Sequence, residues 1–121
     1  MAKGDDIQER MVRLAVALIK VCDLLPETRT AGHIASQLLR SGTSPAANYA
    51  EARGAESDKD FIHKLKIVLK ELNECLIWLA MTQEGQLLSG TSLAKAQEEC
   101  TALCRITAAS IKTVRARMGG I

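Results

Sequence analysis

The sequence predicts an all-α protein, a single antiparallel up-down four-helix bundle over residues 1–121. The 121 residues are 47% hydrophobic but only 2% aromatic, whereas β-sandwiches and barrels favour aromatic and β-branched residues. Apolar residues recur at steps of three and four along four long segments, which is the period of an amphipathic helix. Short turns marked by Pro or Gly separate the segments, and short connections make successive helices antiparallel neighbours.

The first helix is predicted over about 5–25 and ends before Pro26, which has no amide hydrogen to donate. Its apolar seam consists of Ile7, Met11, Leu14, Leu18, Val21 and Leu25. The third helix is predicted over about 57–83, with the Ser57 hydroxyl as a cap for the free amides of its first turn. Its seam consists of Phe61, Leu65, Val68, Leu72, Cys75 or Leu76, and Leu79.

The fourth helix is predicted over about 91–117 and opens at Thr91 or Ser92, after Ser89 and Gly90. Its seam consists of Leu93, Ala96, Cys100, Leu103, Thr107, Ser110 and Val114.

The second helix, predicted over about 28–55, contains Pro45. Its apolar face carries Ala31, Ile34, Leu38, Pro45, Tyr49 and Ala52, and its opposite face Gln37, Arg40, Ser44, Asn48 and Glu51. This two-sided pattern continues across Pro45 and favours one helix kinked there. The alternative ends one helix near Gly42 and begins another with Ser44 as its cap and Pro45 in its first turn.

Two of the predicted helices carry more apolar residues than a lone bundle needs. The first adds Val12, Val16 and Ile19, and the third adds Ile62, Ile67, Leu69, Ile77 and Trp78. A helix whose surface is apolar on most sides is deeply buried or contacts a second partner. In a bundle this small, we expect a homo-oligomer, with Tyr49, Ile67 and Trp78 as candidate interface residues.

Composition and charge indicate a cytoplasmic protein and exclude little else. The formal net charge is +2, too small to identify a nucleic-acid-binding protein. The first residues include Asp5 and Asp6, unlike the basic start of a signal peptide. We expect no membrane span, because no apolar run approaches about 18 residues. Without an export signal, the four cysteines are expected to be reduced.

The sequence carries no pattern that predicts an enzyme, and we expect no catalytic residue, metal or cofactor. A di-metal bundle site needs Glu-x-x-His pairs, but neither His33 nor His63 follows a Glu by three residues. Cys100 and Cys104 lie one turn apart without a companion motif, which favours core packing. The alternative is a small metal- or thiol-dependent enzyme built around Glu71, Glu74, His63 and the cysteines.

Basic residues collect at the end of the chain. No acid follows Glu99, whereas Arg105, Lys112, Arg115 and Arg117 do. Basic residues also suit a helix C-terminus, and spaced aromatic residues for base stacking are missing. In an oligomer, however, this basic arm would be repeated and could contact RNA or DNA phosphates independently of base sequence.

The polar face of the second helix is the most specific feature of the sequence. Arg40, Ser41, Ser44, Asn48 and Glu51 bring together a cation, hydroxyls, an amide and a carboxylate. The interpretation is a structural polar motif in which Arg40 and Glu51 pair beside Asn48.

The chain resembles a family of bacterial four-helix-bundle proteins associated with intervening sequences in 23S ribosomal RNA genes. The resemblance covers about 7–117. Its motif consists here of Arg40, Ser44, Asn48 and Glu51, then Ser57, Asp60 and Phe61, then Lys70, Glu71 and Glu74 before Trp78 and Leu79. The sequence departs from the family pattern at Pro45, where Ile is frequent, and at Ala52, where Gly is usual.

The resemblance implies a bundle without enzymatic activity that assembles as a ring of five subunits. It also suggests nucleic-acid and protein partners, because relatives known as accessory variability determinants bind nucleic acid and a reverse transcriptase. The predicted function is therefore that of a self-assembling interaction or scaffold protein that contacts RNA or DNA backbone through repeated basic arms.

Overall fold

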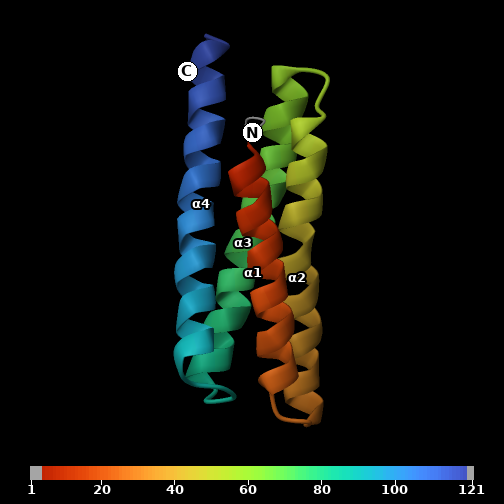
Figure 1. Ribbon diagram of the computed structural model, residues 1–121, viewed down its shortest axis with the longest axis vertical. Helices are drawn as coiled ribbons and strands as arrows, with labels where there is room; N and C mark the ends of the chain where they lie inside the picture. Colours follow the sequence, from red (N-terminus) through yellow and green to blue (C-terminus); the bar gives the residue numbers. More distant parts are fainter. Residues whose placement is uncertain (1–3, 120–121) are drawn as a thin grey trace.

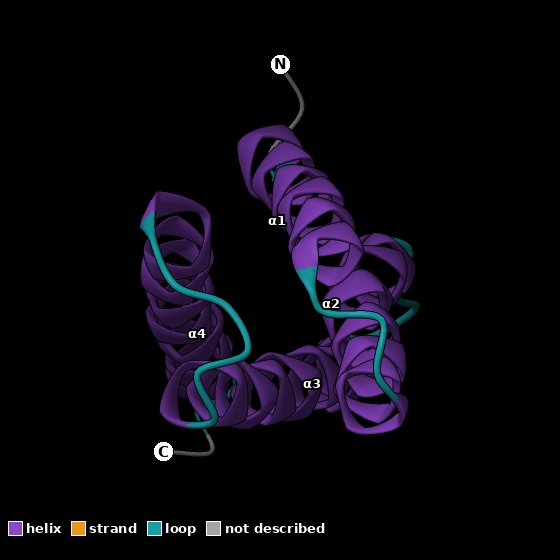
Figure 2. Ribbon diagram, turned by 90° about the horizontal axis from the view of Figure 1, so that it is seen from below, coloured by secondary structure: helices purple, strands orange, loops and turns teal. Residues whose placement is uncertain are grey.

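The computed structural model describes residues 4–119 and confirms the all-α class (Figure 1). The helices are α1 (Asp5–Leu24), α2 (Arg29–Arg53), α3 (Asp58–Glu84) and α4 (Thr91–Arg117). They alternate in direction along one long axis, as expected of an up-down bundle. Seen along that axis, each helix lies beside the next in chain order (Figure 2).

Local capping explains where two of the helices begin. The Thr28 hydroxyl accepts a hydrogen bond from the Ala31 amide at 3.2 Å at the start of α2. The Ser57 hydroxyl accepts one from the Asp60 amide at 3.0 Å at the start of α3, as predicted. Each bond satisfies an amide that has no partner inside its helix.

The predicted apolar seams form the core. Met11, Leu14, Leu18 and Val21 of α1 are buried, together with Leu65, Val68, Leu72, Cys75 and Leu79 of α3 and with Leu93, Ala96, Cys100, Leu103 and Val114 of α4. The side where α1 meets α4 is bridged by Arg10, whose Nη2 and Nε donate to the two carboxylate oxygens of Glu99 at 2.6 Å and 2.9 Å. A bidentate ion pair of this kind fixes the orientation of both side chains.

A single helix, α2, runs through Pro45, so the alternative of two helices broken between Gly42 and Ser44 is wrong. The Pro45 ring is fully buried. Burial of apolar surface helps to offset the hydrogen bond that proline cannot make. The expected kink stays a prediction.

Gly42 marks a close approach of α1 and α2. A Cβ atom placed at Gly42 would lie 2.3 Å from Leu18 Cδ1, and both residues are buried. A glycine inside a helix costs about 1 kcal/mol relative to alanine. Its presence here allows the Leu18 side chain to lie directly on the α2 backbone.

Within residues 4–119, none of the helices combines the length and apolar character that a membrane span requires.

Candidate functional site

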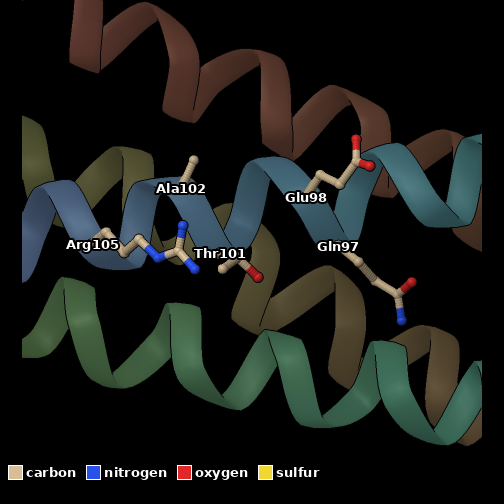
Figure 3. Close-up of a pocket in the computed structure, with 5 residues that line it drawn as sticks. All are labelled: Gln97, Glu98, Thr101, Ala102 and Arg105. Atoms are coloured by element: carbon tan, nitrogen blue, oxygen red, sulfur yellow. The ribbon is translucent and has the colours of Figure 1, made fainter.

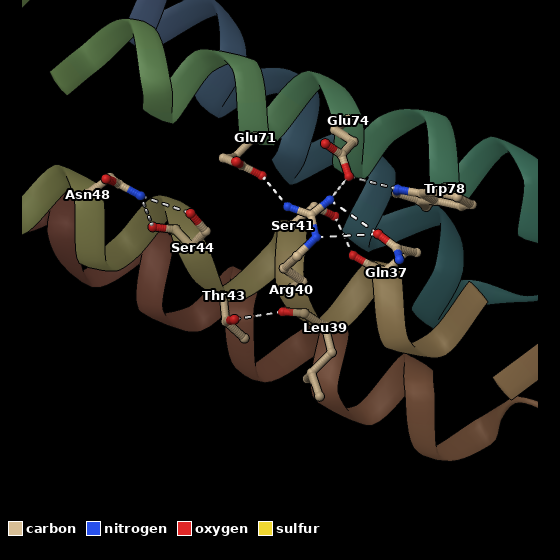
Figure 4. A network of polar contacts seen from close by, with 10 residues as sticks. All are labelled: Gln37, Leu39, Arg40, Ser41, Thr43, Ser44, Asn48, Glu71, Glu74 and Trp78. Carbon is tan, nitrogen blue, oxygen red and sulfur yellow. Dashed lines mark hydrogen bonds and ion pairs between the residues drawn. The ribbon is translucent and has the colours of Figure 1, made fainter. Parts of the chain in front are cut away.

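The polar face of α2 forms a cross-link to α3 that is centred on Arg40 (Figure 4). Arg40 Nη1 lies 3.1 Å from Glu71 Oε2, and Nη2 pairs with Glu74 Oε2. Nε and Nη2 of Arg40 also donate to Gln37 Oε1, each at 3.3 Å. The guanidinium therefore joins one α2 side chain to two carboxylates of α3, as its fork of donors allows.

The other motif residues bond within α2 or to a different α3 residue. Ser41 Oγ donates to the Gln37 carbonyl at 2.8 Å. Asn48 Nδ2 donates to the carbonyl and the hydroxyl of Ser44, at 3.1 Å and 2.8 Å. Lys64 Nζ donates to Glu51 Oε1 at 2.9 Å. The Ser41 and Asn48 bonds satisfy polar side chains within α2, and the Lys64–Glu51 pair adds a second link between α2 and α3.

The expected pairing of Arg40 with Glu51 is wrong. Eleven residues separate them, which is about 16 Å along a helix at 1.5 Å per residue, too far for their side chains to meet. Each residue instead forms ion pairs with the part of α3 nearest to it. Arg40 pairs with Glu71 and Glu74, whereas Glu51 pairs with Lys64.

Trp78 extends the network around Arg40. Its Nε1 donates to Glu74 Oε2 at 3.1 Å, and its ring meets His33 edge-on with 5.8 Å between centroids. The candidate interface residues Tyr49, Ile67 and Trp78 are all half-buried within the chain. Their predicted role between subunits stays a prediction.

The residues of the alternative enzyme do not form one site. Glu71 and Glu74 pair with Arg40, whereas His63 is an exposed residue of α3. Across residues 4–119, no group of three or more His, Cys, Asp or Glu side chains is arranged to hold a metal ion. The geometry thus offers no metal centre for that alternative among the described residues.

Three cysteine thiols gather where α3 and α4 pack together. Cys75 and Cys100 are fully buried, and Cys104 is half-buried. The Cys100 thiol donates to the Leu72 carbonyl at 3.3 Å, and the Cys104 thiol to Asn73 Oδ1 at 3.5 Å. The interaction between the Cys100 and Cys104 thiols raises the pKa of Cys100 and lowers the pKa of Cys104.

Iodoacetamide is expected to label Cys104 before the other thiols, and at lower pH, because a lowered pKa increases the thiolate fraction. Cys22 is a matched control, since it is also half-buried but burial raises its pKa. Peptide mass spectrometry across a pH series measures both rates. Labelling of Cys22 before Cys104 would contradict this prediction.

A shallow depression on α4 is no binding cleft. The residues that line it are Gln97, Glu98, Thr101, Ala102 and Arg105, all on one helix (Figure 3). Their side chains spread over an outer surface and do not converge, unlike the polar groups of a small-molecule site.

Three residues of the basic arm, Arg105, Lys112 and Arg115, are exposed on α4. The fourth, Arg117, donates to Asp58 Oδ1 at 2.8 Å and so pairs with the start of α3. Three lysines of α3, Lys59, Lys66 and Lys70, are also exposed, although none of them was among the predicted nucleic-acid contacts. Their spacing of seven and four residues, which places them on one helix face, was the available signal.

The chain is thus an antiparallel four-helix bundle with a polar seam between α2 and α3. The family model of the 23S rRNA-intervening sequence protein matches residues 4–109, and the chain belongs to this family. This confirms the resemblance drawn from the motif around Arg40.

A solved structure supports the same assignment. It is the crystal structure of a protein of unknown function from the S23 ribosomal protein family of Bacteroides thetaiotaomicron VPI-5482. That protein is 30% identical, with a TM-score of 0.81, and the match covers 88% of this chain and 98% of that one. None of the curated proteins matches this chain.

Proposed function

We propose that this chain is a non-enzymatic, self-assembling interaction protein whose assembled form contacts nucleic-acid backbone. The observation that carries the proposal is an exposed apolar surface, here named the α1/α2 stripe. It consists of Val12, Val16 and Ile19 of α1 and Leu39 of α2, each at least 41% exposed. The two helices lie side by side there, since the Cys22 thiol donates to the Ala35 carbonyl at 3.4 Å.

Assembly would cover the α1/α2 stripe. Burial of its four apolar side chains against a second copy would remove their exposed surface from water, which favours association.

The assembly proposal predicts a sedimentation mass several times 13.1 kDa, and five times that mass for the ring that the resemblance implies. Val16→Glu is expected to reduce the mass, because it places a charge in the α1/α2 stripe. Ala94→Glu is the control, since it adds the same charge at an exposed position of α4. A wild-type monomer would defeat the proposal.

The nucleic-acid part of the proposal rests on Arg105, Lys112 and Arg115, which are exposed and repeated in every subunit of an assembly. We expect salt-sensitive binding of RNA and DNA that weakens when Arg115 and Arg117 are both changed to Gln. Binding that is undetectable even at low salt would remove this part. Stoichiometric iron, manganese or zinc in the purified protein would instead contradict the non-enzymatic part.

A further inference from the structure

Three lysines form a row on the outward side of α3. Lys59, Lys66 and Lys70 are all exposed, and none of them forms an ion pair with a described residue. Lys64, on the α2 side of the same helix, differs because it pairs with Glu51 at 2.9 Å. The row therefore keeps its three charges available to a partner.

A second row of basic residues lies on α4, at the same level along the bundle axis as the lysines of α3. Arg117 reaches Asp58 and Cys104 reaches Asn73, so the C-terminal half of α4 runs antiparallel beside the N-terminal half of α3. Arg105, Lys112 and Arg115 lie in this half of α4. All three are exposed and without an ion pair among the described residues.

Acidic side chains do little to offset these two rows. No acid follows Glu99 in the sequence. In the facing half of α3, Asp58 pairs with Arg117 and Glu71 pairs with Arg40. Asp60 lies one helical turn before Lys64, on the same face of α3, and Lys64 pairs with Glu51 of α2, so Asp60 lies toward α2.

We propose that these six residues, here named the α3/α4 basic face, bind the phosphate backbone of double-stranded nucleic acid. The inference rests on the nucleic-acid part of the proposed function and assigns it a site. These six cations form no ion pair with a residue of the described range 4–119, and they match a regular array of phosphates. They stand on two rigid helices, and the α3 row alone spans about 16 Å at 1.5 Å per residue.

Among the described residues, no Phe, Tyr or Trp side chain is exposed, which favours a duplex over a single strand. Phe61, the aromatic residue of this end of α3, is half-buried and packs against the core. Tyr49 and Trp78 are also half-buried, and Trp78 is bonded to Glu74. Recognition of single strands depends on bases stacking on such rings, whereas a duplex presents its phosphates without unstacking.

The test measures binding of the full chain to a fluorescent 24-base-pair RNA duplex and to the matching DNA duplex, by anisotropy at several salt concentrations. The triple variant K59Q/K66Q/K70Q is expected to lose about tenfold or more in affinity at low salt. Its slope of log affinity against log salt should fall by about 2 to 3, since each phosphate contact contributes about 0.9. A single strand of equal length should bind more weakly than the duplex.

The matched control is K20Q/R29Q/K95Q, which removes the same charge from three exposed positions near the opposite end of the bundle. Affinity within about twofold of wild type is expected there, because these residues lie away from the face. Lys and Gln have similar helix propensities, so circular dichroism should show unchanged helix content in both triples.

Other outcomes separate this inference from the proposed function. Equal losses of affinity in K59Q/K66Q/K70Q and in the control K20Q/R29Q/K95Q would overturn the inference, because they would show an effect of net charge alone. Loss in R105Q/K112Q/R115Q but not in K59Q/K66Q/K70Q would also overturn it, while leaving the basic arm as a site. No binding by the wild type would defeat the nucleic-acid proposal itself. If the α3 triple impairs only binding to vesicles of anionic lipid or to an acidic polypeptide, the duplex is the wrong partner.

Discussion

Gly42→Leu is expected to lower the free energy of unfolding by about 3 kcal/mol, at the upper end of what overpacking a core costs. Even a single Cβ atom at this position would lie 2.3 Å from Leu18 Cδ1 and 3.3 Å from Leu18 Cβ. Leu18 is fully buried in the core and cannot move into solvent. Helices α1 and α2 must therefore separate to admit the larger side chain.

Urea denaturation at one fixed protein concentration measures this loss, because the proposed assembly would make stability depend on concentration. Gly32→Ala is the matched control: Gly32 is also in α2, and a Cβ there would meet nothing within 4 Å. It should stabilise the protein by about 0.5 to 1 kcal/mol. If Gly42→Leu proves as harmless, α1 and α2 do not approach each other closely at Gly42.

Periodicity predicted the core well because each seam keeps one face over many turns. Leu14, Leu18 and Val21 of α1 are buried as expected. Ser57 also predicted the start of α3, since capping depends on the few residues next to it. The continuity of α2 at Pro45 could not be decided locally, because burial of the ring in the tertiary structure opposes the local tendency of proline to begin a helix.

The partners of polar residues were harder to predict than the faces on which they lie. Projecting α2 down its axis places Arg40 and Glu51 on one side but hides the distance between them along that axis. Their actual partners, Glu71 and Lys64, belong to α3, and a single sequence does not reveal the vertical register of two helices. The antiparallel contacts Arg117–Asp58 and Cys104–Asn73, which set the basic residues of α4 alongside the N-terminal half of α3, are equally hidden in one sequence.

Arg40→Met is expected to cost about 2 kcal/mol of unfolding free energy. The variant leaves the carboxylates of Glu71 and Glu74 one turn apart with no cation between them. Their side chains are only 12% and 31% exposed. Removing one partner of a buried ion pair costs about 3 to 5 kcal/mol, and partial exposure reduces that value here. Fluorescence of Trp78, the only tryptophan, should also change, since its Nε1 donates to Glu74.

Two further variants show whether charge, rather than packing, causes this loss. Changing Glu71 and Glu74 to Gln in the Arg40→Met protein should recover more than half of the lost unfolding free energy, because the neutral amides need no cation. Arg13→Met is the control: its pair with Glu9 is 73% and 53% exposed, and such pairs contribute less than about 0.5 kcal/mol. An Arg40→Met effect as small as that of Arg13→Met would mean that the cross-link around Arg40 does not hold α2 against α3.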